Sequence, residues 1–266
     1  MRISLVQNDL AWEHKSANLM SYESLLSGLS GKTDLVVLPE MCTTGFSMHA
    51  TQLAEDNDGE TMSAMRRMAK DYNFAITGSF IGKNKDSIQS PGQEPLCFNR
   101  GFFICPDGSE TFYDKRHLFR MGEEPVHYQA GMDKGLISYL GWNIRLIICY
   151  DLRFPVWCRN VNNEYDLLLV VANWPEVRGH VWQNLLTARA IENMAYVCGV
   201  NRVGTDGLQL KYSGDSQVVN AYGSILTFNE PGVESIQTLE IDLGSLNSFR
   251  KKFPVWKDAD KFEILI

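Results

Sequence analysis

Three short apolar segments constrain most strongly what this chain can fold into. They are residues 35–38, 144–149 and 167–172, and apart from Arg145 they contain only aliphatic residues and one cysteine. A strand with one face in water alternates apolar and polar residues, so segments without this alternation predict strands that are covered on both faces. We therefore expect an α/β fold in which helices pack outside a layered sheet.

Helical and strand patterns alternate along almost the whole chain. Apolar residues at helical intervals predict helices over residues 14–29, 61–72 and 180–195, and a short helix over 156–163. Further strands are predicted over residues 1–7, 74–81, 97–105, 110–113, 196–203 and 217–228, with a polar loop at 83–95 and a turn at 106–108. The tail is less regular, and the basic run at 249–253 indicates a helix end or a solvated face. Because no linker or repeat interrupts this alternation, we expect one domain over residues 1–266.

Composition narrows the classes of function. The net charge is −7 and no basic stripe is present, which argues against a nucleic-acid partner. No segment approaches the roughly 18 apolar residues of a membrane span, and the N-terminus resembles a strand more than a signal peptide. The six cysteines and five histidines lack the spacing of metal ligands or of a disulfide framework. We therefore expect a cytoplasmic protein that uses no metal and no cofactor.

Three predicted strands end at residues that can do chemistry. Glu40 follows the strand at 35–38, Lys115 follows the strand at 110–113, and Cys149 closes the strand at 144–149. Strand ends of α/β sheets are common positions for binding crevices. Together the three form a set for acyl transfer, in which the carboxylate takes the proton from sulfur, the thiolate attacks a carbonyl and the lysine stabilises the oxyanion.

Each of these residues also has a purely structural explanation. A glutamate at a strand end is usually solvated, and Lys115 could belong to a surface salt-bridge cluster with Asp114, Arg116 and His117. A cysteine such as Cys149 is often a small buried hydrophobe. Position alone does not decide between these explanations and catalysis.

The sequence around each candidate resembles a motif of the nitrilase superfamily of carbon–nitrogen hydrolases. Residues 38–41 (Leu-Pro-Glu-Met) resemble its glutamate motif, residues 113–119 (Tyr-Asp-Lys-Arg-His-Leu-Phe) its lysine motif, and residues 149–155 (Cys-Tyr-Asp-Leu-Arg-Phe-Pro) its cysteine motif. Three more segments look like blocks of the same family, at residues 172–175, 188–193 and 212–216. The resemblance covers almost the whole chain and implies an α-β-β-α four-layer sandwich.

The resemblance also implies a second glutamate between the lysine and cysteine motifs. Glu123 and Glu124 compete for this position. Glu124 is favoured because it lies seven residues before Gly131, the spacing expected in the omega-amidase branch. Either residue could instead be a solvated loop acid.

The roles that follow from the resemblance are those of a thiol hydrolase. Glu40 would act as general base and later as general acid, and Lys115 with the backbone N–H of Tyr150 would form the oxyanion hole. Glu124 would fix the geometry, and a thioester would form on Cys149. A nearby lysine should favour the thiolate form of the cysteine.

Within the superfamily, residues 149–155 and the segment after Glu40 look most like the omega-amidase branch, although Cys42 stands where an aromatic residue is expected. Enzymes of that branch hydrolyse the side-chain amide of 2-oxo dicarboxylic acid monoamides, so we expect a small-molecule amide substrate. Arg153 is the candidate for gripping the substrate carboxylate, with a structural salt bridge to Asp151 or Asp166 as the alternative. Three aromatic residues could line the pocket as core or as ligand contacts: Phe46, Tyr150 and Trp174.

Other readings remain open at this point. The chain could be an aliphatic amidase, a nitrilase or a carbamoylase, or a catalytically silent binding protein on the same fold. The resemblance suggests a homodimer, for which Val156 and Trp157 could form an interface or part of the core.

Overall fold

The computed structural model describes residues 1–84, 94–227 and 229–264. Its helices are α1 (Lys15–Ser27), α2 (Ala50–Leu53), α3 (Glu60–Tyr72), α4 (Glu124–His127), α5 (Pro155–Cys158), α6 (Gly179–Asn193) and α7 (Leu243–Lys252). Its strands are β1 (Arg2–Gln7), β2 (Leu35–Val37), β3 (Ala75–Asn84), β4 (Leu96–Ile104), β5 (Glu110–Asp114), β6 (Leu136–Tyr139), β7 (Trp142–Ile148), β8 (Leu167–Ala172), β9 (Tyr196–Asn201), β10 (Val203–Thr205), β11 (Lys211–Ser213), β12 (Gln217–Val219) and β13 (Ser235–Glu240).

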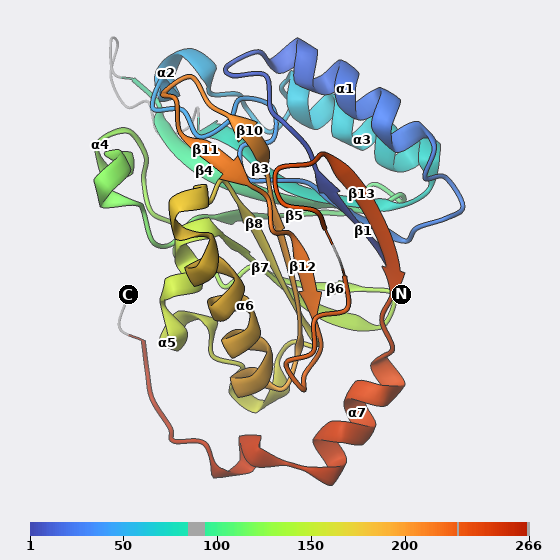
Figure 1. Ribbon diagram of the computed structural model, residues 1–266. Coiled ribbons are helices and arrows are strands. Elements are labelled where there is room, and N and C mark those ends of the chain that lie inside the picture. The colour runs from blue at the N-terminus through green and yellow to red at the C-terminus, as the bar shows by residue number, and fades with distance from the viewer. Residues whose placement is uncertain (85–93, 228, 265–266) are drawn as a thin grey trace.

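Two sheets form the centre of the fold. One has the order β13-β1-β2-β3-β4-β5 and the other the order β12-β9-β8-β7-β6, while β10 and β11 pair as a separate hairpin. The strands at the centre of each sheet run parallel: β1, β2 and β3 in the first, and β7, β8 and β9 in the second. In Figure 1, α1 and α3 lie on the outer side of the first sheet, and α5 and α6 lie on the outer side of the second. The predicted α-β-β-α sandwich is confirmed.

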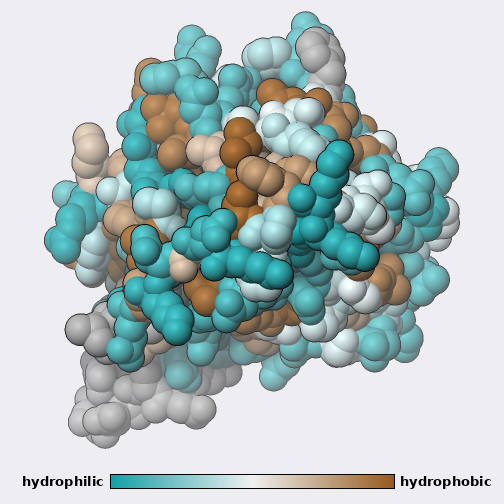
Figure 2. Space-filling view, turned by 90° about the horizontal axis from the view of Figure 1, so that it is seen from below, coloured by the Kyte–Doolittle hydropathy of each residue, from teal (hydrophilic) through white to brown (hydrophobic). Residues whose placement is uncertain are grey.

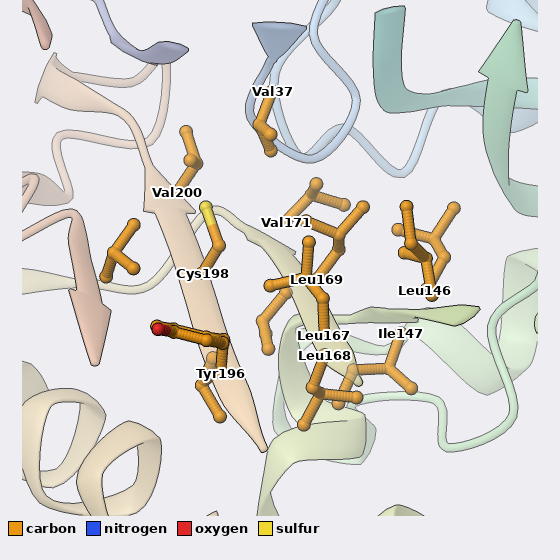
Figure 3. Packing of buried hydrophobic residues seen from close by; sticks show 14 of the residues in the cluster. Val37, Leu146, Ile147, Leu167, Leu168, Leu169, Val171, Tyr196, Cys198 and Val200 are labelled. Carbon is orange, nitrogen blue, oxygen red and sulfur yellow. The ribbon is translucent and has the colours of Figure 1, made fainter. Parts of the chain in front are cut away.

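The residues of strand β2 are apolar without alternation because each face of the strand packs against a different hydrophobic core. Leu35 and Val37 belong to the core between the sheets, whereas Val36 and Leu38 belong to a second core beneath α1 and α3. Figure 3 shows Val37 on the side of the second sheet from which Val171 and Val200 project. Each of these side chains is fully buried, which at roughly 1.5–3 kcal/mol per large aliphatic residue makes the strand a major source of stability.

Most predicted elements are present, and the differences have local causes. The strand expected at 196–203 breaks at Arg202 into β9 and β10. The helix expected at 156–163 is only the single turn α5 followed by a 3₁₀ turn, Val161–Asn163. The strand expected at 217–228 is limited to β12 in the part of it that the structure describes. β3 extends to Asn84, and most of the loop expected at 83–95 lies outside the described residues.

The tail is more regular than its sequence indicates. β13 pairs with β1 at the edge of the first sheet, but its residues are only partly buried, so its hydrophobic pattern is weak. The basic run at 249–253 does include a helix end, that of α7, which begins after the N-cap Asp242. The Asp242 side chain accepts hydrogen bonds from the backbone N–H groups of Gly244 and Ser245, a capping pattern that the sequence contained.

The surface is mixed. Figure 2 shows hydrophilic side chains over much of the face seen from below, with separate hydrophobic patches between them. None of the helices in the described part of the chain combines the length and the apolar character needed to cross a bilayer.

Candidate active site

The three candidate catalytic residues follow three strands and converge. Glu40 lies just after β2, Lys115 directly after β5, and Cys149 directly after β7. The side chains of Glu40 and Lys115 are completely buried, and the Lys115 Nζ donates a hydrogen bond of 2.8 Å to Glu40 Oε1. The surface cluster proposed as an alternative for Lys115 is therefore wrong: Asp114 pairs instead with Arg100.

The second glutamate of this cluster is Glu124. Its carboxylate is buried, lies 3.0 Å from Lys115 Nζ and accepts a 2.6 Å hydrogen bond from the backbone N–H of Phe119. Glu123 has a left-handed backbone (φ 58°) and an exposed side chain. Since neighbouring residues in this turn point in different directions, only one of the two adjacent acids reaches the lysine.

Two asparagines hold the carboxylates in place, and the sequence did not single them out as site residues. Asn99 Nδ2 donates to Glu40 Oε1 at 2.7 Å and to Glu124 Oε1 at 3.1 Å. The backbone N–H of Asn173 donates to Glu40 Oε2 at 2.8 Å. Asn99 is fully buried in β4, and an amide inside a buried apolar strand was the signal that could have found it, because buried polar groups need partners.

The candidate nucleophile, Cys149, lies on a strained turn. Cys149 has φ 45° at the point where β7 ends and a 3₁₀ helix (Cys149–Arg153) begins. Positive φ at a non-glycine residue costs about 1–3 kcal/mol and is common at active sites. Met41, next to Glu40, also has a positive φ of 43°. The turn leaves Cys149 half-buried, with Sγ 4.0 Å from the backbone carbonyl oxygen of Asn173.

The surroundings of Cys149 favour its neutral thiol form. Burial raises the pKa of Cys149 well above its usual range, and the charge and hydrogen bonding of Glu40 raise it further, against an opposing effect of Lys115. The expectation that the lysine favours the thiolate is confirmed for its own contribution, but burial and Glu40 together outweigh it. Lys115 itself stays charged: burial lowers its pKa, but the carboxylates of Glu124 and Glu40 raise it by more. The lysine therefore balances the two carboxylates, and the thiol needs a base.

A second buried network ties the lysine loop to the cysteine turn. Asp151 accepts hydrogen bonds from Tyr113 Oη at 2.7 Å, from the backbone N–H of Ile148 at 3.1 Å and from the backbone N–H of His117 at 2.8 Å. Trp157 Nε1 donates to Tyr113 Oη at 3.1 Å. One carboxylate thereby fixes the ends of both β5 and β7, which sets the position of Lys115 relative to Cys149.

A pocket of about 270 Å³ opens onto this cluster. Its lining includes the candidate site residues Lys115, Cys149, Phe46, Tyr150, Arg153 and Trp174. It also includes residues that the sequence did not single out for binding: Met48, Phe119, Met121, Gly122, Asn173, Pro175, Val177, Arg178, Asp206, Leu208, Leu210 and Tyr212. All four predicted substrate-binding residues thus line the same cavity as Cys149.

Arg153 makes neither of the salt bridges considered for it. Asp151 is surrounded by the donors described above, and Asp166 pairs with Arg250 at 2.5 Å. The Arg153 guanidinium lies 5.1 Å from the centre of the Trp174 ring. Among the residues that the structure describes, no acidic side chain forms an ion pair with it, so its charge is free to meet a ligand.

The chain matches the family model of carbon–nitrogen hydrolases over residues 2–251. This match spans both sheets and every candidate site residue. The chain belongs to the carbon–nitrogen hydrolase family. It is accordingly a hydrolase of carbon–nitrogen bonds other than peptide bonds.

Curated carbon–nitrogen hydrolases similar to this one cover its whole length. It is 44% identical to omega-amidase YafV of Escherichia coli strain K12, over 99% of this chain and 98% of that protein. It is 30% identical to 2-oxoglutaramate amidase of Bacillus subtilis, over 97% of each chain. The fold is also that of a crystal structure, XC1258 from Xanthomonas campestris, a CN-hydrolase superfamily protein with an arsenic adduct in its active site. That structure has a TM-score of 0.93 and 42% identity, over 99% of this chain and 98% of the other.

The described part of this carbon–nitrogen hydrolase contains no group of three or more histidine, cysteine and acidic side chains placed to bind a metal ion. The side chains of the candidate site carry four reactive or charged groups. They supply one thiol, one carboxylate beside it, one buried ammonium group and a second carboxylate that holds the ammonium group in position.

Proposed function

We propose that this protein is an omega-amidase that releases ammonia from the omega-amides of 2-oxo dicarboxylic acids, such as 2-oxoglutaramate and 2-oxosuccinamate. The observation that carries the proposal is the buried set of Glu40, Lys115 and Glu124 beside the half-buried Cys149, at the base of a small pocket. The similarity to omega-amidase YafV and to 2-oxoglutaramate amidases supports the choice of substrate.

Acylation starts from the neutral thiol. Glu40 takes the proton of Cys149 as the sulfur attacks the amide carbonyl carbon, and the carbonyl oxygen becomes an oxyanion. Glu40 then returns this proton to the amide nitrogen, the carbon–nitrogen bond breaks, and ammonia leaves. General acid–base catalysis of this kind contributes about 10²–10⁴ in rate. The acyl group remains as a thioester on Cys149.

The oxyanion has two donors. A lysine ammonium group carries three N–H bonds, and Lys115 uses them toward Glu40 and Glu124 on its buried side, which leaves one for the pocket that it lines. The backbone N–H of Tyr150 is at the start of a helix, where N–H groups lack partners within the helix. Losing such an oxyanion donor typically costs about 3–4 kcal/mol.

Deacylation repeats these steps with water. Glu40 deprotonates a water molecule that attacks the thioester carbonyl, and the same donors stabilise the second oxyanion. The carbon–sulfur bond then breaks, Glu40 reprotonates the sulfur, and the carboxylic acid leaves. In the net reaction one amide and one water give one acid and one ammonia. Glu124 takes no proton in this scheme and positions Lys115.

The pocket suits a small substrate with a negative charge. Arg153 would bind the substrate carboxylate, since a guanidinium group grips a carboxylate with two hydrogen bonds. The apolar part of the substrate would lie against the aromatic residues Phe46, Tyr150 and Trp174. The cavity volume of about 270 Å³ is in the range for a small substrate such as a five-carbon amide.

The test is ammonia release by wild type and by Cys149→Ala, measured side by side on 2-oxoglutaramate, 2-oxosuccinamate, a simple nitrile and an N-carbamoyl amino acid. We expect cysteine-dependent release that is highest with the two oxo-amides. Removal of one sulfur atom should leave the melting temperature nearly unchanged. Full activity of Cys149→Ala would overturn the mechanism, and silence on both oxo-amides would overturn the substrate assignment.

We further propose that residues 1–266 act as a single domain in a cytoplasmic homodimer. The cytoplasm is supported by the six cysteines, all of which are free. The homodimer is supported by exposed apolar side chains on neighbouring outer helices, Val156 of α5 and Ile191 of α6. Trp157 is buried in the core, so it is not an interface residue. Light scattering after gel filtration of wild type and Val156→Asp tests this assembly, which a monomeric wild type would refute.

A further inference from the structure

The charged side chains that line the pocket do not balance. Three cations line it, Lys115, Arg153 and Arg178, against one acid, Asp206. This local excess of positive charge occurs in a chain whose net charge is −7. The charge of Lys115 is compensated by two buried carboxylates, those of Glu40 and Glu124. The guanidinium groups of Arg153 and Arg178 remain as uncompensated cations in the pocket lining.

Asp206 does not neutralise either of them. Its carboxylate accepts hydrogen bonds from the backbone N–H groups of Leu208 and Leu210 at 2.8 and 2.9 Å, and from Tyr212 Oη at 2.8 Å. These three donors satisfy the acid within its own hairpin. Throughout the part of the chain that the structure describes, Arg178 makes no ion pair and its side chain makes no hydrogen bond to an acceptor.

Arg178 is nevertheless held in place. Trp174 Nε1 donates a hydrogen bond of 2.9 Å to its backbone carbonyl oxygen, and the guanidinium lies 5.4 Å from the centre of the Phe119 ring. The guanidinium of Arg153 lies over the ring of the same tryptophan, 5.1 Å from its centre. Both guanidinium groups are thus positioned by aromatic side chains that also line the pocket, a support that orients a cation without neutralising it.

We infer that Arg178 is a substrate-specificity residue, the second cation of a subsite for the 2-oxo acid end of the substrate. This inference rests on the proposed function and deepens it. A 2-oxo carboxylate presents three acceptor oxygens on two adjacent carbons, more than one guanidinium can grip with its parallel pair of N–H groups. Arg153 and Arg178 together supply the donors and the charge for this group, so the enzyme selects 2-oxo acid amides over simple amides.

The variant Arg178→Met removes the charge and keeps an apolar side chain against Phe119. Its matched control is Arg120→Met, because Arg120 is exposed on a neighbouring turn, carries the same charge and does not line the pocket. Ammonia release is measured on 2-oxoglutaramate, on glutaramate, which lacks the oxo group, and on the neutral pentanamide. Melting curves establish that each variant is folded, and Arg178→Lys serves as the conservative variant.

We expect Arg178→Met to raise KM for 2-oxoglutaramate by about 10- to 100-fold, the effect of losing a hydrogen bond to a charged group, with a small change in kcat. Its kcat/KM on pentanamide should fall by a much smaller factor than on 2-oxoglutaramate, so the preference for the oxo-amide collapses. Arg178→Lys should lie between, and Arg120→Met should match wild type. The inference is overturned if Arg178→Met behaves as Arg120→Met or loses activity equally on all three amides. A wild type inactive on 2-oxoglutaramate overturns the proposed function first, and the inference with it.

Discussion

Glu124→Gln tests the central claim that a buried carboxylate positions the catalytic lysine. Both oxygens of Glu124 face buried donors: Oε1 faces Lys115 Nζ and Asn99 Nδ2, and Oε2 faces the backbone N–H of Phe119 and also lies 3.0 Å from Lys115 Nζ. Glutamine has the same shape but only one acceptor end. In either orientation its NH₂ group meets a donor, so one buried donor loses its partner.

The cost follows from these contacts. An unsatisfied buried donor costs about 1–3 kcal/mol, with the upper end of that range when the donor is the charged Lys115. We expect the free energy of unfolding to fall by roughly 1–3 kcal/mol, which at about 2–4 °C per kcal/mol lowers Tm by at least about 2 °C. Since a lysine displaced by about 1 Å costs about 10²-fold in rate, kcat should fall by that factor while KM changes little.

The control is Glu123→Gln, which removes the same charge from the adjacent residue. Glu123 is exposed, so its substitution should change stability by no more than about 0.5 kcal/mol and leave kcat unchanged. Both variants are compared by ammonia release on 2-oxoglutaramate and by thermal melting. A Glu124→Gln enzyme with kcat within threefold of wild type, or a Glu123→Gln enzyme that is equally impaired, would refute the positioning role.

Two further predictions concern the thiol of Cys149 and the hydrogen-bond network around Asp151. Glu40→Gln should abolish turnover yet lower the pKa of Cys149, because the charge and hydrogen bond of Glu40 raise that pKa while Lys115 lowers it. The thiolate absorbance at 240 nm, followed against pH, should therefore appear at lower pH than in wild type. Thiolate formation at the same or a higher pH would contradict this electrostatic explanation. Tyr113→Phe removes the hydroxyl that donates to Asp151 and accepts from Trp157, so unfolding should become easier by about 1–3 kcal/mol; an unchanged melting curve would show that the network does not stabilise the two strand ends.

The layered fold and the positions of the three candidate catalytic residues were predictable because their signals are local. An apolar segment without alternation indicates a strand with two covered faces, and β2, β7 and β8 all conform to this rule. The residues that follow β2, β5 and β7 were identified from position and motif together. The position of a residue at a strand end indicated that its side chain lies at a binding crevice. Only the resemblance to the nitrilase superfamily indicated that the chemistry is that of a thiol hydrolase.

The remaining features depend on contacts between segments far apart in the chain. Asn99 reaches both Glu40 and Glu124, which are 59 and 25 residues away, and no sequence pattern indicates such a meeting. The direction of the pKa shift of Cys149 could not be predicted from the sequence either. It depends on how burial, the Glu40 carboxylate and the Lys115 ammonium group combine in space. Arg178 is a third case: this arginine in a short 3₁₀ turn becomes notable only when the structure places it in the pocket lining, where no acid of the described residues pairs with it.

The raised pKa of the thiol and the two carboxylates around one lysine have a common consequence. Because Glu40 and Glu124 both lie near Lys115, the ammonium group is already paired before substrate binds. Its attraction for a thiolate is therefore too weak to offset burial and the charge of Glu40, and the pKa of Cys149 stays raised. In the proposed mechanism this balance changes when Glu40 takes the proton of Cys149, because the lysine then loses one of its two anions while an oxyanion develops in the pocket. Lys115 therefore interacts more strongly with the transition state than with the bound amide, which is the condition for a group to raise kcat instead of only lowering KM.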